Sequence, residues 1–109
     1  MRNLTPHAIT ISVNGVVNTI QPSGVIARVT TIEESVGVCP VTGAHIVRRS
    51  FGRAESIGSP SDGTCLVSSL VLSALGSEWR GVAFAPDTGD TAIRNDKGHI
   101  IAVTRLVTV

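Results

Sequence analysis

The stretch "HAITISVNGVVNTI", residues 7–20, decides the first part of the fold. Two runs rich in β-branched residues lie on either side of Asn14-Gly15, and both residues of that pair tolerate the positive φ of a type I′ turn. Within residues 8–13, larger apolar side chains alternate with smaller ones, which gives a strand one buried face and one partly wet face. The sequence therefore predicts a β-hairpin at this place.

After this hairpin the chain continues as strands separated by turns. "PSG" at 22–24 interrupts the pattern, and "VIARVTTIEE" at 25–34 predicts a third strand whose charged end runs into solvent. The segment "SVGVCPVTGA", 35–44, is rich in turn residues. "HIVRRSFG", 45–52, then predicts another strand, with alternate residues on its two faces.

The second half of the sequence adds one helix. "TCLVS", 64–68, predicts a short buried strand, and Ser68 or Ser69 is placed to cap a short helix through Leu75. "RGVAFA", 80–85, returns as a strand, and the last residues form a hairpin around the turn "NDKG".

These elements define the expected fold class. Seven or eight short strands, built from hairpins, and one short helix make a mainly β protein (α+β in the strict sense). We expect a small β-barrel or sandwich. The length favours a single domain over residues 1–109.

Composition narrows the range of partners. The chain is 42% hydrophobic and 16% charged, has a net charge of +1, and contains only three aromatic residues, one Trp and two Phe. A nearly neutral chain without stacking side chains is a poor binder of nucleic acid or anionic membranes, so neither partner is expected. Cys39 and Cys65 follow no signal peptide, and no apolar run reaches transmembrane length. We expect both thiols to be reduced and mostly buried in a cytosolic protein.

The tripeptide Asp87-Thr88-Gly89 has the form of an aspartic protease motif. That chemistry needs two carboxylates sharing a proton, so a chain of this size would have to dimerise through Asp87. The residues that follow are used up by one hairpin and leave no room for the flap of a retroviral protease. We therefore interpret the motif as a turn, in which Asp87 caps backbone N–H groups and Gly89 supplies conformational freedom.

Other polar residues could bind a ligand. Ser68 and Ser69 lie where a strand passes into a helix, a place where backbone N–H groups favour anions. His7 follows a rigid proline at the mouth of the first strand. Arg94 is the preferred phosphate partner among the arginines, because it lies in the hairpin directly after the Asp-Thr-Gly turn. The histidines and cysteines show no metal-ligand spacing, so neither a metal site nor a cofactor is expected.

An ordered set of short motifs runs through nearly the whole chain and is weakest from Ser35 to Ala44. The motifs are Asn-Leu-Thr-Pro-His at 3–7, Pro-Ser-Gly at 22–24, Val-Ser-Ser at 67–69, Pro-Asp-Thr at 86–88, and an arginine-containing hairpin with a glycine turn at 90–98. As a set they resemble a family of small uncharacterised proteins of tailed phages and prophages. The resemblance implies a protein made in the cytoplasm of an infected bacterium.

The recurring polar residues of that set sit at strand ends and turns. Strand-end groups that converge from distant segments often line a ligand site. We therefore expect one polar site, formed by His7, Ser68, Ser69, Asp87, Thr88 and Arg94.

Three functions follow from this expectation. The first is a non-catalytic binding protein that sequesters a small anionic, nucleotide-like signal of bacterial anti-phage defence. The second is a structural or host-takeover role in which no small molecule is bound. The third is a small hydrolase that uses Asp87 and His7 as a general acid–base pair. A homo-oligomer is expected, because exposed strand edges and abundant Val and Ile favour pairing between chains.

Overall fold

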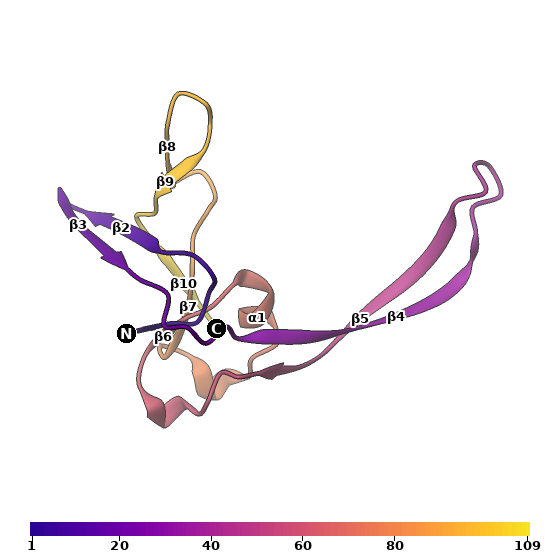
Figure 1. Ribbon diagram of the computed structural model, residues 1–109, viewed down its shortest axis with the longest axis horizontal. Coiled ribbons are helices and arrows are strands. Elements are labelled where there is room, and N and C mark those ends of the chain that lie inside the picture. Colours follow the sequence, from indigo (N-terminus) through magenta and orange to yellow (C-terminus); the bar gives the residue numbers. More distant parts are fainter.

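The computed structural model describes residues 1–109 as ten strands in four small sheets, with one α-helix and two 3₁₀-helices (Figure 1). The strands are β1 (Arg2–Asn3), β2 (Ile9–Val13), β3 (Val16–Ile20), β4 (Arg28–Val38), β5 (His45–Glu55), β6 (Cys65–Leu66), β7 (Ala83–Pro86), β8 (Ile93–Arg94), β9 (Ile100–Ala102) and β10 (Leu106–Thr108). The helices are α1 (Ser69–Ser73), η1 (Pro60–Asp62) and η2 (Ser77–Trp79). The mainly β class is confirmed. None of the helices is long and apolar enough to cross a bilayer.

The central sheet is mixed, with the strand order β1-β6-β7-β10. Strands β1, β6 and β7 run parallel, and β10 closes the order antiparallel to β7. Parallel neighbours need a crossover connection, and α1 with η2 supplies it between β6 and β7. This βαβ unit positions the polar residues of the candidate site.

The core is small and lies between the central sheet, α1 and the base of β4 and β5. Only 15 of the 109 residues are buried. The largest cluster of buried apolar residues consists of Leu4, Ala27, Ile57, Cys65, Val67, Val71, Leu72, Trp79, Ala83 and Ala85. Val, Leu, Ile and Ala predominate, as the scarcity of aromatic residues in the sequence predicts.

The first predicted hairpin is confirmed. Asn14 and Gly15 have φ angles of 51° and 79°, the positive values that a type I′ turn requires. The β2 and β3 strands pair over their whole length, from Ile9 with Ile20 to Val13 with Val16. An isolated bridge from β2 to Val103 holds the hairpin against the C-terminal part of the chain.

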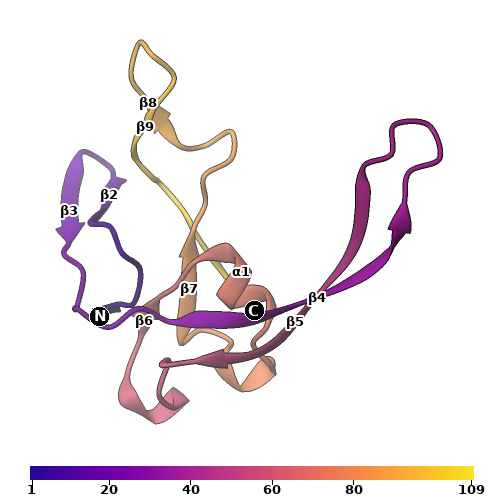
Figure 2. The ribbon, with the colours of Figure 1, turned by 45° about the vertical axis from the view of Figure 1, so that its right-hand side comes forward.

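A long two-stranded arm leaves the rest of the molecule. Strands β4 and β5 pair antiparallel and extend away from the other sheets in both views (Figures 1 and 2). The radius of gyration is 17.0 Å, whereas a compact chain of this length would have about 13 Å. The sequence predicts both strands but ends the first of them at residue 34. The structure continues β4 to Val38, across a bulge after Ser35 that accommodates the turn-rich residues.

Other expectations differ from the structure in detail. Ten strands are present instead of seven or eight, and the sheets do not close into a barrel. The additional strands include β1, a two-residue strand paired with residues more than sixty positions away, for which no local pattern exists. The predicted last strand is divided into β9 and β10. The first part, β9, pairs with β8, and the second part, β10, pairs with β7 in the central sheet.

Both cysteines are free, and only one of them is buried. Cys65 lies in the core, and burial raises the pKa of its thiol. Cys39 is partly exposed at the far end of the arm, where hydrogen bonding to the Thr42 side chain and to the Thr42 and Val41 backbone lowers its pKa. The expectation that both thiols are mostly buried is therefore wrong for Cys39, because the arm carries it away from the core.

Candidate functional site

A recess of about 370 Å³ lies beside the central sheet. Its walls come from three segments that are far apart in the sequence. The lining residues are Thr5, Pro6, His7, Ile9, Val67, Ser68, Ser69, Pro86 and Thr88. The volume is within the range of roughly 300 to 1,000 Å³ that is usual for small-molecule sites.

The topology of the central sheet explains why these segments meet. The residues from Thr5 to His7 follow β1, those from Val67 to Ser69 follow β6, and Pro86 and Thr88 lie at and after the end of β7. Because the three strands are parallel, their carboxyl ends lie at one edge of the sheet. Ligands of open parallel sheets bind outside this edge, where the loops diverge.

A buried asparagine fixes the loop that carries His7. Asn3 is 1% exposed, and its Nδ2 donates hydrogen bonds to the carbonyl oxygens of His7 (2.8 Å) and Ile20 (2.9 Å). Its Oδ1 accepts hydrogen bonds from the backbone N–H of Thr5 (3.0 Å) and from the Thr5 hydroxyl (2.6 Å). The side chain thus uses both donors and both acceptor positions. Sequence reasoning missed Asn3, although it begins the Asn-Leu-Thr-Pro-His motif.

The two serines have different roles. Ser68 is the N-cap of α1, and its hydroxyl accepts a hydrogen bond of 3.3 Å from the Val71 N–H, as expected for a cap. Ser69 is exposed and lines the recess, so its hydroxyl can reach a ligand. The helix has only five residues, which leaves it a minor source of electrostatic attraction for an anion.

The Asp-Thr-Gly segment forms a turn. The Gly89 N–H donates a 3.1 Å hydrogen bond to Asp87 Oδ1, and the Arg105 guanidinium donates to Asp87 Oδ2 through Nε (3.0 Å) and Nη2 (2.7 Å). Gly89 does not have a positive φ, so the expected conformational freedom is not its role. A Cβ atom at this position would lie 3.2 Å from Asp87 Oδ1, and the glycine therefore makes room for the turn.

These contacts make stability depend on pH. The hydrogen bond from Gly89, followed by the contact with Arg105, holds the pKa of Asp87 below its usual value. A carboxyl group whose pKa is lowered by folding stabilises the fold above its unfolded pKa of about 3.9, and this contribution is lost as the pH falls through the lowered value. We expect Asp87→Asn to lower the urea midpoint near neutral pH and to match the wild type in strong acid. Asp90→Asn, in the same loop, is the control and should change the midpoint little at any pH.

Arg94 makes its contacts outside the recess. Its Nη1 donates to the Gly98 carbonyl oxygen (2.8 Å), and its Nη2 donates to the Thr88 carbonyl oxygen (3.2 Å). The side chain thus ties the β8–β9 hairpin to a residue of the recess wall. The structure brings four of the six candidate residues around one recess, namely His7, Ser68, Ser69 and Thr88. Asp87 and Arg94 do not line it and are engaged with Arg105 and with backbone carbonyls, respectively.

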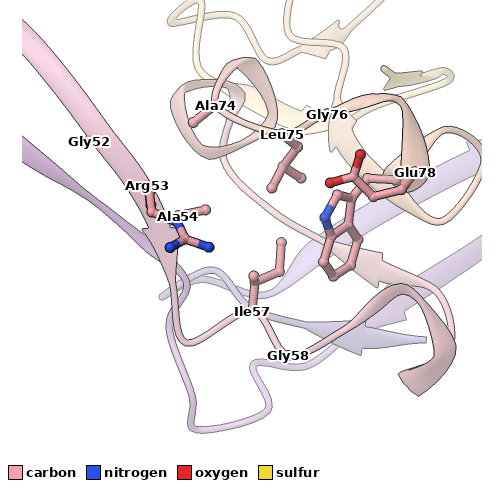
Figure 3. Close-up of a pocket in the computed structure, with 10 residues that line it drawn as sticks. Gly52, Arg53, Ala54, Ile57, Gly58, Ala74, Leu75, Gly76 and Glu78 are labelled. Atoms are coloured by element: carbon pink, nitrogen blue, oxygen red, sulfur yellow. The ribbon is translucent and has the colours of Figure 1, made fainter.

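A second recess, of about 290 Å³, lies between the base of the arm and the α1–η2 segment. Figure 3 shows Arg53 on the arm side and Glu78 on the opposite side, with Leu75 and Ile57 between them. This recess is not located at the ends of the parallel strands, and Trp79 in its wall is a core residue. The first recess is therefore the stronger candidate for a ligand site.

The first recess is lined by uncharged hydroxyl groups, one imidazole and apolar side chains. The polar side chains that line it are those of threonine, serine and histidine, and no carboxylate lines it. No group of three or more His, Cys, Asp or Glu side chains is placed to hold a metal ion. Proline rings and the side chains of Ile9 and Val67 supply apolar walls.

Comparisons of the chain with protein-family models, with curated proteins and with solved structures find no match.

Proposed function

We propose that the protein is a non-catalytic binding protein whose recess takes a small anionic ligand of the nucleotide class. The observation that carries this proposal is the convergence of three strand-end loops around one recess of about 370 Å³. The resemblance to phage proteins supports a more specific role, the sequestration of a nucleotide signal of anti-phage defence. It also supports the cytoplasm of the infected host as the place of action.

The lining groups suit an anion with hydroxyl groups. The hydroxyls of Ser69 and Thr88 can donate or accept hydrogen bonds, and the His7 imidazole can do both. Asp87, which precedes the lining residue Thr88 in the sequence, forms an ion pair with Arg105. Little negative charge near the recess therefore opposes an anionic ligand. Apolar walls formed by Ile9, Val67 and the proline rings can cover the faces of a base.

Binding without turnover is favoured over hydrolysis. A hydrolase of the expected kind needs Asp87 as a general base beside His7. The Asp87 carboxylate instead accepts hydrogen bonds from Gly89 and Arg105, which lower its pKa and make it a weak base. A ligand held in this recess should therefore be released chemically intact.

The proposal is tested by ligand depletion. Purified protein is incubated with a panel of cyclic dinucleotides and ADP-ribose derivatives, the protein is removed by filtration, and free ligand is quantified by chromatography. We expect stoichiometric depletion of at least one compound and its intact recovery after denaturation. If no compound is depleted, the proposal is wrong, and if an altered compound is recovered, the protein is an enzyme.

A charge variant locates the binding. Ser69→Asp places a carboxylate in the recess and at the first position of α1, where a negative charge does not oppose the helix. We expect the dissociation constant of a depleted anion to rise at least about tenfold, which corresponds to about 1.4 kcal/mol. Ser77→Asp, which adds the same charge at the start of η2 away from the recess, is the matched control. Equal affinities of the two variants would place the ligand elsewhere.

An interaction role without a small molecule is the second candidate. The observation that favours it is the exposed arm, which carries large apolar side chains on both faces. Recovery of the protein in purified particles, or with a host protein from infected cells, together with no depletion of any nucleotide, would support this role.

A further inference from the structure

The β4–β5 arm is a sheet with nothing beside it. The two strands pair only with each other, and their base alone is anchored, through Val29 and Ala54 against the core (Figures 1 and 2). An isolated two-stranded hairpin is marginally stable in water, because it has no second layer on which to bury its side chains. The arm therefore needs a covering surface.

Both faces of the arm carry apolar side chains. Directly opposed residues lie on the same face, so the strand register divides the arm into two faces. The pairs on the first face are Thr31 with Phe51, Glu33 with Arg49, and Ser35 with Val47. The pairs on the second face are Ile32 with Ser50, Glu34 with Arg48, and Gly37 with Ile46.

The exposure of these apolar side chains is large and similar on the two faces. Phe51 is 49% and Val47 is 48% exposed on the first face, whereas Ile32 is 56% and Ile46 is 43% exposed on the second. A hairpin that covers a core with one side alternates apolar and polar residues and leaves a polar outer face. Neither face of the arm is polar in this way, so either face can pack against another surface.

The charges in the middle of the arm are separated by strand, whereas the base carries the opposite arrangement, Arg28 on β4 facing Glu55 on β5. The two glutamates in the middle of the arm, Glu33 and Glu34, lie on β4, and the two arginines opposite them, Arg48 and Arg49, lie on β5. They form exposed ion pairs across the strands, at 2.6 Å for Glu33 with Arg49 and 3.6 Å for Glu34 with Arg48. The middle of the arm thus has an acidic segment of β4 beside a basic segment of β5, with apolar residues on either side of these charges.

This pattern is complementary to itself. When a second arm is turned over about its long axis and laid on the first, its acidic segment covers the first arm's basic segment, and the reverse holds on the other side. A two-fold interface requires this kind of self-complementary patch. On the first face, Phe51 and Val47 of β5 then lie over the short side chains of Thr31 and Ser35 on β4 of the second arm.

We propose that the arm packs against the arm of a second copy of this chain. Its eleven-residue strands are about 36 Å long and the pair is about 10 Å wide, so each face covers about 350 Å². A contact between two arms therefore buries about 350 Å² on each copy, less than half of the roughly 800 Å² per partner that is usual for a stable interface, so we expect a weak association that depends on concentration. The exposed apolar residues on the facing sides of the two arms are buried in this contact, and the ion pair of that face lies against its equivalent in the second arm.

Charge variants of the arm test the proposal. One variant carries Glu33→Arg and Glu34→Arg, and the other carries Arg48→Glu and Arg49→Glu, so the middle of each arm has charge of a single sign. We expect the wild type to associate with itself, as measured by light scattering over a concentration series from micromolar to millimolar. Each variant alone should dissociate, with a dissociation constant raised at least about 100-fold by like charges at the interface. An equimolar mixture of the two variants should recover the oligomer.

A third variant separates the interface from the arm's own stability, since like charges across the strands also weaken the hairpin. It carries all four changes and so retains the ion pairs within the arm with their direction reversed. We expect it to associate with itself and not with a tagged wild-type chain, because its acidic segment now meets the wild-type acidic segment.

Three results would each overturn the proposal. They are a monomeric wild type, single-sign variants that remain associated on their own, and a mixture of single-sign variants that stays monomeric while each is folded by circular dichroism. Free exchange of the fully reversed variant with the wild type would equally contradict the proposed pairing of strands.

Discussion

Replacement of Asn3 by leucine should lower the free energy of unfolding by about 3 kcal/mol or more. The substitution puts an apolar side chain of similar size in the buried place and removes the Asn3 partner of four hydrogen-bonding groups, the carbonyls of His7 and Ile20 and the N–H and hydroxyl of Thr5. The Thr5 hydroxyl and the His7 carbonyl oxygen, 3.0 Å apart, can still bond to each other, so the loss falls mainly on the Thr5 N–H and the Ile20 carbonyl. Each buried polar group left unsatisfied costs about 1 to 3 kcal/mol, and solvent can reach some of these four. Urea unfolding followed by the fluorescence of Trp79, the single tryptophan, measures the loss.

Two further variants show whether the hydrogen bonds are responsible. Asn18→Leu changes an exposed asparagine on β3 and should alter stability by less than about 0.5 kcal/mol. Asn3→Asp has nearly the shape of the original residue but cannot donate to the two carbonyls while ionised, so we expect a loss comparable to that of the leucine variant. A fully stable Asn3→Asp protein would show that Asn3 only fills space.

The second large effect is expected for Trp79→Ala. Trp79 is 5% exposed and belongs to the ten-residue apolar cluster. Removal of a buried tryptophan side chain costs about 3 to 5 kcal/mol, through lost burial and the cavity that remains. With so few buried residues the whole fold is expected to be stable by only about 5 kcal/mol, so the variant should retain at most about 2 kcal/mol and be partly unfolded at room temperature. Far-ultraviolet circular dichroism measures this, because the fluorescent residue itself is removed.

A matched change on the arm provides the control. Phe51 is the aromatic residue on β5 and is 49% exposed. Phe51→Ala should change the unfolding free energy of the single chain by less than about 0.5 kcal/mol, because no core contact is lost. If Phe51→Ala and Trp79→Ala are equally destabilising, the core is not organised around Trp79 as described.

The candidate site was only partly predictable from the sequence. His7, Ser68, Ser69 and Thr88 could be selected because polar residues after strands mark loops that carry function. The ion-pair partner of Asp87 could not be predicted, because Arg94 is closer to it in the sequence than Arg105 is. Only the pairing of β10 with β7 brings Arg105 beside Asp87. The apolar walls of the recess and the supporting role of Asn3 also depend on how the loops after β1, β6 and β7 meet.

The features that could be predicted from the sequence alone depend on interactions between residues a few positions apart in the chain. The Asn14-Gly15 turn follows from backbone sterics, the Ser68 cap from one hydroxyl near the first N–H groups of a helix, and the alternation along β5 from the pleat of a strand. Only the tertiary structure decided the parallel pairing of β1 with β6, the recess at their carboxyl ends, and the separation of the arm from the core. These features join segments far apart in the chain, and their free energy comes from burial and hydrogen bonding between those segments, which no local pattern encodes.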